Sequence, residues 1–128
     1  IHLNGELVQD IENLVVTAGK GFVASRMSGT SADVMSHMAV GTSTTSASAG
    51  QTALVSESAR VALASTSVSS AVVTYTATFP AGTGTAALTE AGILNASSSG
   101  TMLCRTVFSV VNKGSADAMT ITWTVTVS

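Results

Sequence analysis

Charged residues are scarce in this chain. Asp, Glu, Lys and Arg make up 9% of its 128 residues, against about 25% in an ordinary soluble domain. The five basic residues are scattered along the sequence, and the formal net charge is -2. No basic stripe is therefore available to neutralise a phosphate backbone, which argues against a nucleic-acid partner.

Cysteine and long apolar runs are also lacking. Cys104 is the only cysteine, so an intramolecular disulfide is excluded and assembly in a reducing cytoplasm is expected. No apolar run approaches the ~18 residues that span a bilayer. The first residues show neither the basic nor the long apolar region of a secretory signal peptide. We therefore expect no membrane partner.

Serine and threonine are abundant, and they follow a regular pattern at the C-terminal end. Residues 118–128 alternate throughout, with threonine at the even positions from 120 to 126. The odd positions are apolar: Met119, Ile121, Trp123, Val125 and Val127. Because side chains on a strand point alternately to opposite faces, this pattern predicts a strand with a buried apolar face and a hydroxyl-bearing face.

Further strands are predicted along the chain. Residues 71–79 alternate in the same way, while residues 101–111 are apolar on both parities, which favours a central strand. Weaker candidates are residues 35–40, 60–66 and 88–95, and turn residues separate them. Short strands without long helical segments between them predict an all-β fold, namely an antiparallel β-sandwich or jelly-roll-like domain.

The N-terminal region has a different pattern. Residues 6–16 place apolar side chains at a spacing compatible with either a short helix or a short strand. Ala18-Gly19-Lys20-Gly21 is expected to break this pattern, and residues 22–27 are expected to be extended. We therefore divide the chain into an N-terminal arm, residues 1–33, which contains a short helix or strand, and a β-sandwich domain, residues 34–128.

Two connections have clear turn or loop composition. Residues 41–52 (GTSTTSASAGQT) are low in complexity and too polar to pack, which predicts a long surface loop. Asn112-Lys113-Gly114 predicts a hairpin turn between the last two strands, because Asn and Gly accept positive φ at low cost.

The motifs that could carry chemistry are weak. Residues 82–87 (GTGTAA) match a loose dinucleotide fingerprint, but Pro80 precedes them and no acidic residue follows at the required distance, so a plain inter-strand loop is favoured. His37 lies beside Met38, yet the chain has too few convergent donors for a metal site, and a structural or interface histidine is the preferred interpretation. No nucleophile elbow or acid–base pair is visible. We predict no catalytic, cofactor-binding or metal-binding residues, no small-molecule substrate and no enzymatic activity.

Four charged residues lie within the β region: Glu57, Arg60, Glu90 and Arg105. Two of each sign favour ion pairs across neighbouring strands that fix their register, in preference to a carboxylate dyad. The two amphipathic aromatics, Tyr75 and Trp123, occupy apolar parities of predicted strands and are expected to pack in the core.

Several phrases resemble small virion proteins of tailed bacteriophages. They are residues 38–42 (MAVGT), 59–63 (ARVAL), 88–96 (LTEAGILNA) and 100–108 (GTMLCRTVF), followed by the threonine-rich end. The most specific are Glu-Ala-Gly-Ile and Met-Leu-x-Arg-Thr, which join a charge to an apolar strand. The likeness covers residues 38–127, and Cys104 departs from it where a small residue such as Ala is expected.

The resemblance implies a capsid decoration, or cement, protein with a β-sandwich or jelly-roll fold. Such a protein binds the exterior of the capsid, with the major capsid protein and copies of itself as partners, and residues 1–33 and 41–52 are then the expected contact segments. Similar domains occur in phage tail and tail-fibre proteins, so a structural or attachment component of the tail is the alternative. Neither implies a cofactor.

Overall fold

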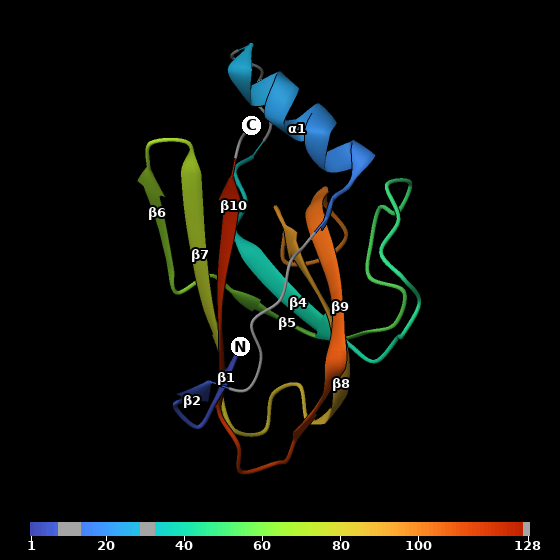
Figure 1. The fold of residues 1–128 in the computed structure, drawn as a ribbon, viewed down its shortest axis with the longest axis vertical. Coiled ribbons are helices and arrows are strands. Elements are labelled where there is room, and N and C mark those ends of the chain that lie inside the picture. Colours follow the sequence, from blue (N-terminus) through green and yellow to red (C-terminus); the bar gives the residue numbers. More distant parts are fainter. Residues whose placement is uncertain (8–13, 29–32, 127–128) are drawn as a thin grey trace.

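The protein is a two-layer β-sandwich with one helix. The computed structural model describes residues 1–7, 14–28 and 33–126 (Figure 1). Two antiparallel sheets of five strands each pack face to face, and helix α1 (Thr17–Met27) lies at one end of the sandwich. The predicted all-β antiparallel sandwich is confirmed.

Each sheet combines segments that are distant in the sequence. The first sheet has the order β2 (Glu6–Leu7), β1 (His2–Leu3), β10 (Met119–Thr126), β7 (Val72–Phe79) and β6 (Ser65–Ser69). The second has the order β3 (Leu14–Val15), β9 (Met102–Lys113), β8 (Ala86–Leu94), β4 (His37–Gly41) and β5 (Glu57–Ala62). Every pairing is antiparallel.

The alternating pattern of β10 is confirmed as the basis of the core. Met119, Ile121, Trp123 and Val125 are buried, while the threonines between them point outward. Trp123 lies directly opposite Tyr75 on β7, and both aromatics pack in the core as predicted. Val127 lies outside the described residues.

The strand predicted to be central has this position. β9 lies between β3 and β8 in the second sheet, and residues 102–106 are buried on both parities. Its inner face contacts the core, and α1 packs against the strand. Two covered faces explain why this segment shows no alternation.

Residues 17–27 have a different structure from the one that the sequence predicts. The expected break at residues 18–21 and the expected extended piece at residues 22–27 are both wrong, because a continuous helix spans Thr17–Met27. Gly19 is the one buried residue of this helix. A Cβ there would lie 2.0 Å from the carbonyl oxygen of Leu103 on β9. This glycine therefore permits close packing of α1 on β9.

Segments of the N-terminal region add strands to both sheets. β1 pairs with the start of β10, and β3 pairs with β9. A tight turn at Asn4-Gly5, with φ of 51° and 84°, joins β1 to β2. This dipeptide is the usual hairpin signal, and the sequence interpretation missed it. Of the segment predicted as helix or strand, residues 8–13 lie outside the described residues; the division at residue 33 stays a prediction.

Two other predicted boundaries are wrong. Residues 60–66 do not form one strand, because the chain leaves β5 at Ala62 and enters β6, in the other sheet, at Ser65. Asn112 and Lys113 belong to β9, and the turn begins at Gly114. The Lys113 side chain is buried, and its Nζ donates to the carbonyl oxygens of Pro80 (2.9 Å) and Asp117 (2.6 Å). It therefore ties the two turns at this end of the sandwich together.

Candidate interaction surfaces

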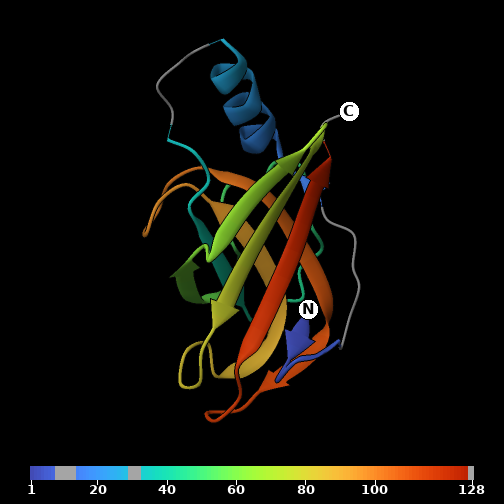
Figure 2. The ribbon, with the colours of Figure 1, turned by 90° about the vertical axis from the view of Figure 1, so that its left-hand side faces the viewer.

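The outer side of the first sheet is an uncharged surface of hydroxyl groups. Apart from Val72, the outward positions of β6, β7 and β10 are all serine or threonine. We call them the hydroxyl face: Ser65, Ser67, Ser69, Thr74, Thr76, Thr78, Thr120, Thr122, Thr124 and Thr126. The three strands run side by side across this layer (Figure 2).

Strand register aligns the hydroxyl face in rows. Thr74 is opposite Ser67 and Thr124, and Thr76 is opposite Ser65 and Thr122. The hydroxyls of Thr78 and Thr120 are 3.3 Å apart. A hydroxyl both donates and accepts hydrogen bonds, so such a face can pair with exposed peptide groups of a partner and leaves no ion without a partner when it is buried.

A buried ion pair organises the opposite side of the molecule. Glu90 on β8 and Arg105 on β9 are both fully buried, and Arg105 Nη2 and Nε each lie 3.0 Å from Glu90 Oε1. The register places Arg105 opposite Gly92, so the pair is diagonal between neighbouring strands. The predicted cross-strand pairing is confirmed for these two residues.

The same pair holds the loop of residues 42–56 in place. Glu90 accepts backbone N–H bonds from Ser43 (3.2 Å), Val55 (3.0 Å) and Ser56 (2.7 Å). Arg105 Nη1 donates to Thr45 O (2.9 Å) and to a side-chain oxygen of Gln51 (3.1 Å). The predicted surface loop between β4 and β5 is therefore fixed at several points along its length, which the sequence did not indicate.

The other two charged residues form a pair within one strand. Arg60 Nη2 and Nε donate to the two carboxylate oxygens of Glu57, at 2.7 and 3.0 Å. Arg60 Nη1 also donates to the carbonyl oxygens of Ala96 and Ser99. For this pair the predicted cross-strand arrangement is wrong, because both residues belong to β5, three positions apart. Arg60 holds the turn that follows β8.

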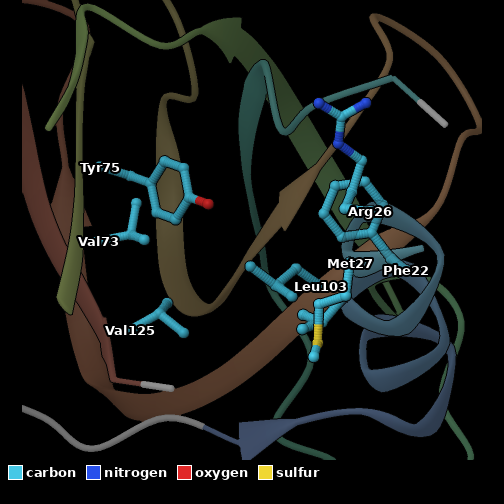
Figure 3. A pocket seen from close by; sticks show the side chains of 8 residues that line it. Phe22, Arg26, Met27, Val73, Tyr75, Leu103 and Val125 are labelled. Carbon is cyan, nitrogen blue, oxygen red and sulfur yellow. The ribbon is translucent and has the colours of Figure 1, made fainter. Parts of the chain in front are cut away.

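An apolar pocket lies between α1 and the end of the sandwich (Figure 3). Its volume is about 440 Å³. Residues from α1, β7, β9 and β10 line it: Phe22, Val23, Arg26, Met27, Val73, Tyr75, Leu103 and Val125. The Tyr75 hydroxyl points into it. Burial raises the pKa of Tyr75, and the nearby Cys104 thiol raises it further. The lining residues include no carboxylate, histidine or nucleophile–base pair.

The remaining candidates of the sequence analysis belong to different elements: His37 to β4, Cys104 to β9, and residues 82–87 to the start of β8 and the loop before it. His37 Nδ1 is 2.7 Å from the hydroxyl of Ser36, as for a structural histidine. Cys104 is a buried free thiol, and burial raises its pKa. The loop at residues 82–87 runs into β8, not into the helix that a dinucleotide site requires. Within residues 1–7, 14–28 and 33–126, no group of three His, Cys, Asp or Glu side chains is placed to hold a metal ion.

Two further tests concern membrane spans and similarity to known proteins. The single helix of the described residues is too short and too polar to cross a bilayer. Comparisons with protein-family models, with curated proteins and with solved structures find no match to the chain. The function is therefore inferred from the residues and their arrangement.

Proposed function

We propose that this chain is a structural virion protein that binds the outside of a bacteriophage capsid and cements neighbouring major capsid subunits. The resemblance of residues 38–127 to phage decoration proteins supports the class of protein. The hydroxyl face carries the proposal, because it is an uncharged surface that extends over three paired strands. A cement protein stabilises a lattice by adding contact area at its seams, and this surface supplies such area.

The chemistry of the hydroxyl face suits a seam between subunits. Burying an unpaired charge costs much free energy. Burying a hydroxyl costs little when the hydroxyl forms a hydrogen bond with a donor or acceptor. Each serine or threonine can do both, and each keeps this ability at any pH a virion meets. Such a face can therefore be covered by a capsid subunit without a set of matching charges on that subunit.

The loop of residues 42–56 is the second proposed contact. The middle of this loop is polar and exposed, but Glu90 and Arg105 bind residues on both sides of it and hold them against the sandwich. A loop that is already ordered loses less conformational entropy when a partner binds it. The buried ion pair thus acts on binding indirectly, by fixing the shape that a capsid subunit meets.

The number of copies per particle tests the location. Quantitative mass spectrometry of virions from the phage that encodes the chain should give a ratio to the major capsid protein that is close to a simple lattice fraction. A decoration protein repeats with the lattice, so its copies rise with capsid size. A small fixed number of copies per particle would overturn the proposal and indicate a tail or tail-fibre component instead.

A charge on the hydroxyl face should disrupt binding. Thr122 is exposed and lies in the middle of β10. Thr122→Lys should lower occupancy on the virion by about tenfold or more, because the seam would bury an unpaired ammonium group. Thr85→Lys makes the same change at an exposed site outside the hydroxyl face, and occupancy should stay normal. Equal occupancy of the two variants, measured by mass spectrometry, would exclude this face from the contact.

A further inference from the structure

β6 is an edge strand with no protection against pairing. It is the last strand of the first sheet, and all five of its residues, Ser65–Ser69, are exposed. Figure 1 shows it at the outer side of the β6–β7 hairpin. Protein sheets usually guard such an edge with a charge, a proline or a bulge. β6 contains neither charge nor proline, and its register with β7 is unbroken.

The other terminal strands of the two sheets are guarded or short, and β9 and β10, which β3 and β1 each pair over two residues only, contain buried residues along their length. β2 and β3 each contain two residues. β5 carries the Glu57–Arg60 ion pair. Among the described strands, β6 is thus the one edge that combines useful length, full exposure and no charge. Its outer row of peptide groups has the chemistry that an extended backbone recognises.

The side chains of β6 favour a second copy of the same strand as the partner. Antiparallel pairing about a two-fold axis through Ser67 places Ser65 opposite Ser69 of the second copy and Ser67 opposite its own copy. Thr66 then faces Val68, whose side chain is 70% exposed in the single chain. No like charges meet, and a β-branched cross-strand pair is gained on each side of the axis.

We propose that β6 pairs antiparallel with β6 of a second copy, so that two chains form one continuous ten-stranded sheet. The contact is isologous, since the same strand serves both partners. It also joins two hydroxyl faces into one surface, because Ser65, Ser67 and Ser69 of both copies point to the same side. The pairing needs only the purified chain and does not depend on the capsid proposal.

A charge exchange at Ser67 tests this pairing. Analytical ultracentrifugation of the purified chain should show a dimer whose population rises with concentration. Ser67→Lys and Ser67→Asp should each weaken the dimer by about fivefold or more at low salt, because two like charges then meet at the axis. An equimolar mixture of the two variants should recover the dimer. Thr122→Lys and Thr122→Asp, on the hydroxyl face but away from the edge, should leave it unchanged.

The outcomes separate the two proposals. The β6 pairing would be overturned if the chain stays monomeric at every concentration, or if a charge at position 67 does not change the dimer population. Neither result would affect the copy-number measurement. A mixture that stays dissociated would also overturn the β6 pairing, because a symmetric contact requires opposite charges to attract at the axis. Ser67 is exposed, so both variants should keep the far-ultraviolet circular dichroism of the parent chain.

Discussion

Replacing Glu90 with glutamine should remove about 3–5 kcal/mol from the free energy of unfolding. Glutamine has nearly the shape of glutamate, but it leaves the fully buried Arg105 without its counter-ion. It also puts an amide NH₂ in place of one carboxylate oxygen. Each of these oxygens accepts two hydrogen bonds, so two donors lose their acceptor whichever way the amide is oriented.

Glu57→Gln is the matched control. It makes the same change in the pair with Arg60, where the Glu57 side chain is 31% exposed and the Arg60 side chain 9%. Because this carboxylate still meets water, the change should cost less than about 1 kcal/mol. Urea unfolding followed by the fluorescence of Trp123, the single tryptophan, measures both. Losses of equal size would show that the buried pair does not hold the fold together.

A second measurement separates the ion pair from the loop. Glu90→Gln should speed the hydrogen exchange of the Ser43, Val55 and Ser56 amides, because they lose part of their acceptor. Adding Arg105→Met should recover some of the lost stability, because no charge is then left buried alone. It should not recover the exchange protection of the loop. Loop amides that keep their protection in Glu90→Gln would contradict the role assigned to this carboxylate.

A methyl group at Gly19 should detach α1 from β9. The added Cβ would lie 2.0 Å from the carbonyl oxygen of Leu103 and 2.7 Å from its carbon. Both are backbone atoms of a central strand and have no rotamer by which to move aside. Gly19→Ala should therefore lower the stability by about 1–3 kcal/mol, even though alanine favours helix formation more than glycine does.

Gly21 provides the control two positions further along the helix. A Cβ there meets no atom within 4 Å, so Gly21→Ala should raise the stability by up to about 1 kcal/mol through helix propensity alone. Thermal unfolding of the two variants should thus give shifts of opposite sign. Shifts of the same sign would show that the position of α1 on β9 does not depend on close contact at Gly19.

Strand prediction succeeded where burial of one face produces an alternating apolar and polar sequence. β7 and β10 alternate because one side of each meets the core, and residues 102–106 of β9 lack alternation because both sides of the strand are covered there. α1 failed for a related reason. Its two glycines lower helix propensity, and the gain that offsets this loss comes from contact with β9, which is distant in the sequence.

The candidate surfaces could be foreseen only in part. The threonines of β10 and β7 predict one hydroxyl-bearing face for each strand, but their joining into a single surface depends on which strands are neighbours. Residue types indicated ion pairs among the four charged residues of the β region but not which partners meet, and the structure joins Arg105 to Glu90. The three loop amides that share this carboxylate are 34 to 47 positions away from it, and no local pattern signals such contacts.

By itself, the sequence determined the all-β class, the buried and exposed sides of the main strands, and a polar surface with little charge. These properties follow from side-chain period and composition, which are local. The tertiary structure alone decided the strand order, the helix held against β9, the loop fastened to a buried ion pair, and the open edge at β6. Each of these depends on contacts between residues that are distant in the sequence, and such contacts contribute free energy only in the folded chain.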